Sequence, residues 1–192
     1  LPVYCDIDGA EGWTVLMQRT KMDSSFDQPW EKYKNGFGNM SHDGDFWLGL
    51  EDMHQITNQM FRTFELQIVI TDASGVPYIF PYKSVKIGSK TENYALNLGE
   101  YTGIISSPYA KTSLPFITRD KNPQLNGCTS HAENANLEYY SGWWIPETAY
   151  NRYNSYSNCR KIANLNAPNI FWTTELGSNR KITKVVMRIK PN

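Results

Sequence analysis

The sequence carries no excess charge of either sign and no long hydrophobic run. Lys and Arg together number 19, and Asp and Glu together also number 19, so the formal net charge is zero. Binding to the phosphates of a nucleic acid needs a basic surface, so this balance argues against nucleic acid as a partner. No apolar run approaches the roughly 20 residues of a membrane-spanning helix, which argues against insertion in a membrane.

The motifs of the common enzyme classes are missing too. The sequence contains no GxSxG, no HExxH, no phosphate-binding GxxxxGK(S/T) and no dinucleotide fingerprint. With only three histidines, a Cys–His or Ser–His pair has no support in the sequence. We therefore predict a protein that is not an enzyme, with a Cys-dependent hydrolase as a distant alternative. We expect His54 to be structural and the acidic run 42–45 to be a solvated turn rather than a metal site.

Cysteine is scarce, with only Cys5, Cys128 and Cys159. In a secreted chain an odd number leaves one cysteine without an internal partner. The alternative to a secreted chain is a cytosolic protein in which all three cysteines are free, buried thiols. Leu1 begins directly in strand-like sequence and no signal peptide is present, so we expect the chain to be the mature portion or a fragment of something longer.

Aromatic side chains, by contrast, are abundant. The sequence contains 12 Tyr, 8 Phe and 6 Trp. Irregular, loop-rich domains often rely on such large side chains for buried area, so for any single ring the first interpretation is the core. The length of 192 residues suits one domain that can bury such a core.

Hydrophobic alternation with a period of two predicts the strands. We expect strands at 3–7, 13–19, 64–71, 78–87, 94–98 and 181–189. Pro77 and Pro81 indicate that parts of the strand 78–87 lie at a sheet edge. From 102 to 180 periodicity is weak and Asn, Ser, Pro and Gly are frequent, which predicts a lobe with few regular elements. The strand 181–189 then returns to the central sheet.

Two short helices are predicted between the strands. Asp27 followed by Pro29 indicates a helix start, because Asp can accept hydrogen bonds from free amides and Pro suits the first turn. This helix runs through Tyr33 and ends at Gly36. A second helix fits residues 51–57.

Six aromatic and glycine-rich phrases follow one another in a fixed order. They are GWTVLMQR from Gly12, WEKYKNGFGN from Trp30, DFWLGLEDMHQIT from Asp45, FELQIVITDASG from Phe64, NYALNLGEYTG from Asn93 and SGWW from Ser141, with KITKVVMRIKP from Lys181 as a closing tail. In order and spacing they resemble the fibrinogen C-terminal globular domain, the recognition module of fibrinogens, tenascins, angiopoietins, ficolins and tachylectins. The resemblance covers nearly the whole chain.

The resemblance implies one fibrinogen C-terminal-like domain over residues 1–192, with its N-terminal part truncated. The fold would be α+β, with a central mixed, mostly antiparallel, twisted sheet, two short helices and a loop-rich C-terminal lobe. We divide the chain into an N-terminal remnant (1–44), a central sheet (45–101 with 181–191) and a lobe for ligand and calcium (102–180).

The resemblance also assigns the cysteines. Cys5 matches a family cysteine that pairs with one further upstream, before Leu1. Cys128, which precedes SGWW, and Cys159, which precedes NLN, match the family's second disulfide.

A candidate calcium site lies in the loop 120–127. Calcium takes about six to eight oxygen ligands, and the family supplies two carboxylates and two backbone carbonyls here. The matching positions are Asp120, Asn122, Gln124 and Asn126. Because only Asp120 keeps a carboxylate and Lys121 puts a cation nearby, we expect calcium to be absent or weakly held, and we expect no other cofactor.

The family's ligand pocket lies around the paired tryptophans, where lectin members bind acetylated sugars and fibrin binds an exposed peptide end. Aromatic walls suit sugar rings and methyl groups, and nearby polar groups fix orientation. The candidates in this neighbourhood of the sequence are His131, Tyr139, Tyr140, Trp143, Trp144 and Arg160. For the two tryptophans, a place in the core is the alternative. Fibrin polymerisation is not expected to carry over, because Ser178 stands where a basic residue is needed.

One departure from the family is the long segment between Trp144 and Cys159, where the family has only a few residues. The inserted stretch 145–158 is rich in Tyr, Asn and Ser, a composition typical of binding loops. We predict that residues 149–158 are exposed beside the ligand pocket. The partner-binding residues would be Tyr150, Arg152, Tyr153 and Tyr156. A surface loop without function is the alternative.

These implications point to a secreted, extracellular domain that binds a protein in cell signalling, adhesion or development. Lectin-type recognition of acetylated glycans is the alternative. Asn39, in the sequon Asn-Met-Ser, is a candidate N-glycosylation site. Family members oligomerise through upstream coiled coils or disulfides, so we expect oligomerisation to involve a region before Leu1.

Overall fold

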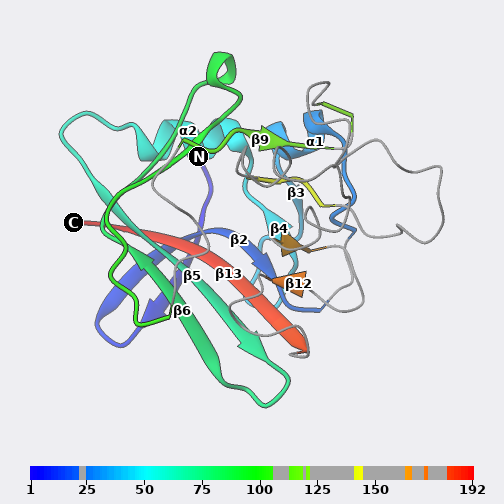
Figure 1. Cartoon of the computed structure of the whole chain (residues 1–192), viewed down its shortest axis with the longest axis vertical. Coiled ribbons are helices and arrows are strands. Elements are labelled where there is room, and N and C mark those ends of the chain that lie inside the picture. Colours follow the sequence, from blue (N-terminus) through cyan, green and yellow to red (C-terminus); the bar gives the residue numbers. More distant parts are fainter. Residues whose placement is uncertain are drawn as a thin grey trace, which may run out of the picture.

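The computed structural model describes residues 1–21, 25–105, 113–118, 120–121, 141–144, 163–165, 171–172 and 181–192 (Figure 1). Its main element is a sheet of seven strands: β1 (Tyr4–Asp8), β2 (Glu11–Arg19), β3 (Phe37–Gly38), β4 (Phe46–Trp47), β5 (Phe64–Asp72), β6 (Pro77–Tyr82) and β13 (Ile182–Pro191). Their order is β3-β4-β2-β13-β5-β6, with β1 beside β2. Every described pairing is antiparallel, and the α+β fold with a mostly antiparallel sheet is confirmed.

The last strand, β13, lies in the middle of this sheet between β2 and β5 (Figure 1). Val185 pairs with Arg19 on one side and with Ile70 on the other. Val185, Met187 and Ile189 are fully buried, as the alternation of apolar residues predicts. The closing strand therefore returns to the central sheet, as expected.

The predicted strand 78–87 is in fact two strands in different sheets. Its first part is β6, the outermost strand of the main sheet, which confirms the edge position that Pro77 and Pro81 indicate. The chain then leaves this sheet at Lys83, whose amide donates to the carbonyl of Glu100 (2.9 Å). Strand β6 ends because the backbone pairs with β5 only as far as Tyr82 and then with Glu100, although the alternation of apolar residues continues.

In the described part of the chain, three two-stranded sheets accompany the main sheet. They pair β7 (Val85–Ile87) with β8 (Leu96–Leu98), β9 (Phe116–Ile117) with β10 (Trp143–Trp144), and β11 (Ala163–Asn164) with β12 (Phe171–Trp172). A 3-10 helix, η1 (Lys90–Glu92), lies between β7 and β8. The boundaries proposed for the three sub-lobes stay a prediction.

Helix α1 (Trp30–Asn35) ends where the sequence predicts but does not begin there. Gly36 follows it with φ of 90°, and its amide donates to the carbonyl of Lys32 (2.8 Å). The residue directly before the helix is Pro29, which has no side chain that can cap. The helix begins at Trp30, three residues after Asp27, so the predicted start at Asp27 is wrong.

Helix α2 (Leu50–Thr57) agrees with the predicted helix 51–57. Leu50 and Met53 are buried in the core, and the Nδ1 atom of His54 lies 2.8 Å from the carbonyl oxygen of Ile87. That contact ties α2 to β7, so the structural role expected for His54 is confirmed. No helix among the described residues is long and apolar enough to cross a membrane.

Candidate recognition site

Strand β10 is formed by the paired tryptophans of the predicted ligand lobe, and we call it the floor. Trp143 and Trp144 are both fully buried. The ring of Trp144 lies 5.0 Å from that of Phe116 and 5.5 Å from that of Trp47, measured between centroids. Such aromatic clusters add geometry-dependent attraction to buried area. The burial favours the core interpretation of the two tryptophans, and their contact with a ligand stays a prediction.

Hydrogen bonds fix this floor from the side of α1. The amide of Gly142 donates to the hydroxyl of Tyr33 (2.9 Å), and that hydroxyl donates in turn to the carbonyl of Phe26 (2.7 Å). Burial raises the pKa of Tyr33 far above its ordinary value, so the hydroxyl keeps its proton. The indole N–H of Trp47 donates to the carbonyl of Tyr33 (3.0 Å). One tyrosine therefore joins α1, β4 and the floor.

A strained turn holds the floor from the side of β8. Asn93 and Tyr94 have φ of 51° and 46°, in the left-handed region that residues other than glycine seldom adopt. The carbonyl of Asn93 accepts from the amide of Phe116 (3.0 Å), and that of Tyr94 accepts from the indole N–H of Trp144 (2.9 Å). The hydroxyl of Tyr94 donates to Glu51 of α2 (2.5 Å). Local strain of this kind persists where surrounding contacts impose it.

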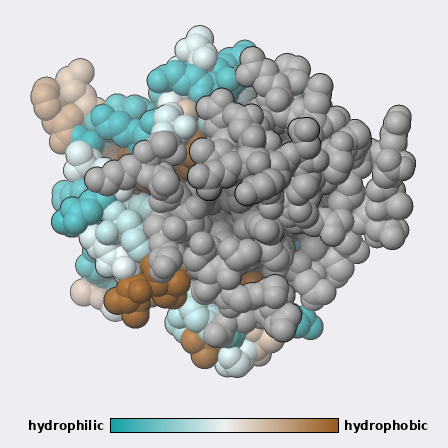
Figure 2. All heavy atoms as spheres, viewed as in Figure 1, coloured by the Kyte–Doolittle hydropathy of each residue, from teal (hydrophilic) through white to brown (hydrophobic). Residues whose placement is uncertain are grey.

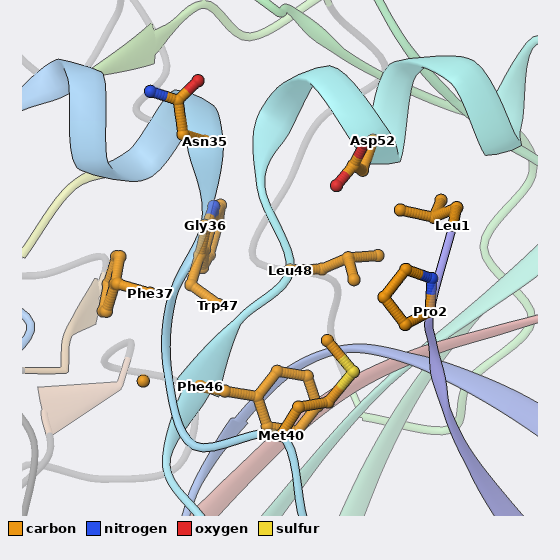
Figure 3. A pocket seen from close by; sticks show the side chains of 11 residues that line it. Leu1, Pro2, Asn35, Gly36, Phe37, Met40, Phe46, Trp47, Leu48 and Asp52 are labelled. Atoms are coloured by element: carbon orange, nitrogen blue, oxygen red, sulfur yellow. The ribbon is translucent and has the colours of Figure 1, made fainter.

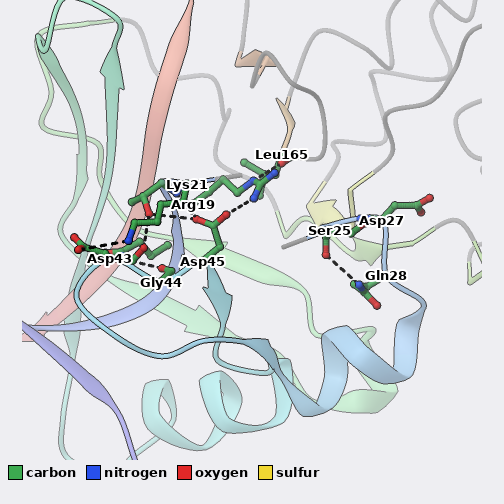
Figure 4. A network of polar contacts seen from close by, with 11 residues as sticks. Arg19, Lys21, Ser25, Asp27, Gln28, Asp43, Gly44, Asp45 and Leu165 are labelled. Atoms are coloured by element: carbon green, nitrogen blue, oxygen red, sulfur yellow. Dashed lines mark hydrogen bonds and ion pairs between the residues drawn. The ribbon is translucent and has the colours of Figure 1, made fainter. Parts of the chain in front are cut away.

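A buried ion pair connects the main sheet to the same lobe (Figure 4). Arg19, at the end of β2, pairs with Asp45, and both side chains are almost completely buried. The Nε atom of Arg19 donates to the carbonyl of Leu165 (2.9 Å), whose own amide donates to the hydroxyl of Ser141 (3.0 Å). Through these contacts β2 is connected to the residue that begins SGWW.

The burial of Asp45 corrects a prediction made from the sequence. We expected the acidic run 42–45 to be a solvated turn, and its last residue is not solvated. Burial acts to raise the pKa of Asp45, but the amides of Thr20 and Lys21 and the guanidinium of Arg19 outweigh it and hold the pKa below its ordinary value. The prediction failed because Asp45 is buried in an ion pair with Arg19, and a run of acidic residues in the sequence does not reveal that partner.

Asp120, the first residue of the predicted calcium loop, caps helix α1. Its two carboxylate oxygens lie 3.0 and 3.2 Å from the amide nitrogen of Trp30, and Oδ1 also accepts from the hydroxyl of Thr118 (2.8 Å). The Nζ atom of Lys121 lies 3.7 Å from the centroid of the Trp30 ring, a cation–π contact. Both residues thus dock this segment onto the start of α1.

Absent or weak calcium binding in this loop stays a prediction, which the described residues favour. Asp120 is the one carboxylate of the predicted ligand set, its oxygens already accept hydrogen bonds, and the neighbouring residue is cationic. Over the residues that the structure describes, no group of three or more His, Cys, Asp or Glu side chains could hold a metal. The other three predicted ligands, Asn122, Gln124 and Asn126, lie outside the described residues.

Most of the predicted ligand-binding residues lie outside the described residues. Those outside the described residues are His131, Tyr139, Tyr140, Tyr150, Arg152, Tyr153, Tyr156 and Arg160, together with Cys128 and Cys159. Cys5 is exposed and forms no disulfide in the described part of the chain. Asn39 is exposed, so its glycosylation stays a prediction.

Sequence reasoning missed the residues whose hydrogen bonds position the segment 141–144 and Leu165. Arg19, Tyr33 and Tyr94 each lie within one of the six phrases or at its end. Their residue types alone do not indicate a role in positioning the site. The burial of an arginine next to a buried aspartate, and left-handed φ at a tyrosine, are properties of the folded chain. Only the order of the phrases could have pointed to them.

Known proteins resemble this chain over its whole length. The sequence profile of the family described as "Fibrinogen beta and gamma chains, C-terminal globular domain" matches residues 1–192. Fibrinogen-like protein 1 of Homo sapiens is 31% identical over 203 residues, which cover 99% of this chain and 63% of that protein. Angiopoietin-related protein 2 of Mus musculus is 30% identical over 207 residues, which cover 100% of this chain and 38% of that protein.

Solved structures show the same likeness. The fibrinogen-like globe domain of human ANGPTL2 has a TM-score of 0.71 at 28% identity, over 99% of this chain and 85% of that one. The lamprey fibrin D-dimer in complex with the peptide Gly-His-Arg-Pro-amide has a TM-score of 0.68 at 20% identity, over 97% of this chain and 63% of that one. The second likeness shows the fold alone. This chain spans 62–64% of the length of the fibrinogen-like relatives it matches.

Proposed function

Because this chain belongs to the family of fibrinogen C-terminal globular domains, we propose that it is a secreted recognition domain that binds a protein ligand outside the cell. The relatives named fibrinogen-like and angiopoietin-related proteins support this proposal. The protein that carries the domain would act in cell signalling, adhesion or development. The proposed role is binding without catalysis.

The observation that carries the proposal is the fixed position of Trp144 directly before the inserted segment 145–158. Its side chain is fully buried, and its indole N–H is bonded to the carbonyl of Tyr94. A segment that starts from a rigid strand loses less conformational freedom when it binds a partner. The sequence of this segment offers tyrosines and an arginine, the residue types that dominate interface energetics.

Burial of the tryptophans favours a protein over a glycan. A sugar ring needs an exposed aromatic face, and the two largest rings of the predicted pocket are fully buried in the core. Tyr139 and Tyr140 would then be the remaining aromatic walls. Recognition of acetylated glycans is the second candidate, supported by the family resemblance and by these two tyrosines.

Two parallel arrays test the proposal with the intact chain. One array carries purified ectodomains of cell-surface and matrix proteins, and the other carries acetylated and non-acetylated glycans. The proposal expects saturable binding to an ectodomain that free N-acetylglucosamine does not inhibit. Binding confined to acetylated glycans, and inhibited by N-acetylglucosamine, would establish the lectin alternative. Binding to neither array would contradict both.

A further inference from the structure

The turn that follows β9 is closed by its own hydrogen bonds. The amide of Lys121 donates to the carbonyl of Thr118 (3.2 Å), and the amide of Thr118 donates to the carbonyl of Lys121 (3.4 Å). The hydroxyl of Thr118 also donates to the carboxylate of Asp120 (2.8 Å). Ile117, directly before the turn, pairs with Trp143 of the floor. These bonds fix the points at which two charged side chains leave the turn. We call Thr118, Asp120 and Lys121 the Lys121 turn.

Both charged side chains contact one residue, Trp30, which begins α1. The carboxylate of Asp120 accepts from its amide, and the Nζ atom of Lys121 lies 3.7 Å from the centroid of its ring. The ring is buried and packs against the rings of Tyr94 (5.9 Å) and Phe116 (6.1 Å). Tyr94 comes two residues after η1, whose exposed residues form a hydrophilic surface at the top of Figure 2, where Figure 1 places this helix. Lys121 therefore places a positive charge against a ring that otherwise packs in the aromatic cluster around the floor.

The indole N–H of Trp30 does not fix this ring. It is buried, and no described residue accepts a hydrogen bond from it. The indole N–H groups of Trp47 and Trp144, by contrast, each donate to a backbone carbonyl. Contacts with the faces of the Trp30 ring must therefore supply what a hydrogen bond supplies for the other two tryptophans.

The two ends of α1 are held by different parts of the chain. At its C-terminal end Gly36 lies beside Trp47 of β4 (Figure 3), so closely that a Cβ atom at Gly36 would lie 3.1 Å from the carbonyl oxygen of Trp47. At its N-terminal end the Lys121 turn contacts Trp30. The turn is thus a connection between the start of α1 and the strand β9 that pairs with the floor.

We propose that the ammonium group of Lys121 is a built-in cation that joins the turn after β9 to α1, so that this part of the lobe is held without a metal ion. An aromatic face attracts an ammonium group but offers no oxygen ligands, of which calcium takes about six to eight. The carboxylate of Asp120 is turned to the amide of Trp30 and the hydroxyl of Thr118. A divalent cation at this carboxylate would have the like charge of the neighbouring lysine beside it.

The alternative is a turn held by a calcium ion, with further oxygens from residues beyond Lys121, while the ammonium group merely rests on Trp30. The two accounts differ in what releases the turn from α1. Loss of the ammonium group releases it in the proposal, with or without calcium. Removal of calcium releases it in the alternative. The inference does not depend on the proposed function, because it concerns how the turn is held and not what the lobe binds.

Hydrogen exchange of the Trp30 amide in the whole chain tests the proposal, because this amide is bonded to Asp120 only while the turn is attached to α1. Its rate is measured by NMR in calcium chloride and in EDTA, and the wild type should give the same rate in both. Lys121→Met should exchange about tenfold faster in both solutions, because the cation–π contact is lost. Lys121→Arg keeps a cation over the ring and should stay within about threefold of the wild type.

Lys86→Met provides the control, since Lys86 is an exposed lysine of β7, in a different sheet from β9. It should exchange as the wild type does. Circular dichroism and the melting temperature identify any variant that fails to fold, and the comparison of calcium with EDTA needs only the wild type. A Trp30 amide that calcium protects in the wild type overturns the proposal. So does a folded K121M that exchanges at the wild-type rate, or a K121R that exchanges as fast as K121M.

Discussion

Gly142 shows how closely the floor of the recognition lobe is packed. A Cβ atom at this position would lie 2.7 Å from Cε2 of Tyr33 and 2.9 Å from Cζ of Phe116. Both rings are fully buried, so neither can move aside without disturbing its neighbours. The motif SGWW thus contains a glycine because two aromatic rings occupy the space of a side chain.

We predict that Gly142→Ala lowers the free energy of unfolding by about 2 kcal/mol, the cost of overpacking a well-packed core. Urea denaturation followed by tryptophan fluorescence measures the change. Gly12→Ala is the matched control, because a Cβ atom at Gly12 would meet nothing within 4 Å. Equal stability of the two variants would contradict the packing described.

Asp45 is a buried charge that the fold uses, and its pKa is held below the ordinary value. Its contribution to stability is therefore fully present above the pKa of an unfolded aspartate, near 3.9, and is lost as the pH falls through the lower folded pKa. We predict that Asp45→Asn lowers the free energy of unfolding by about 3 kcal/mol at pH 7, because it breaks a buried pair. The difference from the wild type should shrink on acidification below about pH 4.

The neighbouring Asp43 provides the control for this measurement. Its side chain is 65% exposed, and its contact with Lys21 is long (3.6 Å). Asp43→Asn should therefore change the free energy of unfolding by less than about 1 kcal/mol. If urea denaturation gave both variants the same stability from pH 3 to pH 7, the buried pair would not have the role assigned to it.

At the scale of elements, helix α1 takes its cap from a residue far away in the sequence. The amide of Trp30 donates to Asp120, so the start of α1 and the segment after β9 stabilise each other. In this arrangement contacts within the chain dock the segment onto α1.

We predict that Asp120→Ala lowers the free energy of unfolding by about 1 kcal/mol, the typical cost of a lost helix cap. Asp120→Asn keeps an acceptor oxygen and should lose less. Calorimetric titration of the wild type with calcium should show absent or weak binding. Tight binding that Asp120→Ala abolishes would contradict the account of this loop.

The elements also show which parts of the fold the sequence could predict. Strands β5 and β13 and helix α2 were predictable because their apolar residues recur with a clear period over one face. The cap of α1 was not, because Asp120 is brought to it only by the tertiary fold. The break between β6 and β7 was missed because the partner of Lys83 changes while the alternation of apolar residues does not.

The candidate site was less predictable than the fold, for a related reason. The phrase SGWW marked the right segment, but whether Trp143 and Trp144 face a ligand or the core depends on the rings around them. Of the two rings that pack against them, Trp47 lies in the phrase that starts at Asp45, and Phe116 lies outside all of the phrases. A motif can identify such a segment without showing the direction in which its side chains point.

At the scale of the whole molecule, a bond between Cys128 and Cys159 would enclose the floor strand β10 in one covalent loop. We predict this disulfide from the family resemblance, and a loop of this size stabilises the fold by roughly 3–4 kcal/mol in the chain-entropy model. Peptide mapping of non-reduced protein by mass spectrometry should recover the two cysteines in one linked fragment. Two separately alkylated thiols would contradict the assignment.

The central claim is that this domain recognises a protein through the segment inserted after Trp144. The most direct test measures the affinity of an ectodomain identified on the array for the chain in which Tyr150, Tyr153 and Tyr156 are all replaced by Ser. The account predicts that binding weakens by more than about tenfold, because tyrosines of this kind dominate interface energetics, while the melting temperature stays nearly unchanged. Val76→Ser, which changes an exposed apolar residue on the β5–β6 hairpin, should bind as the wild type does. Unaltered affinity of the triple variant, or its failure to fold, would contradict the claim.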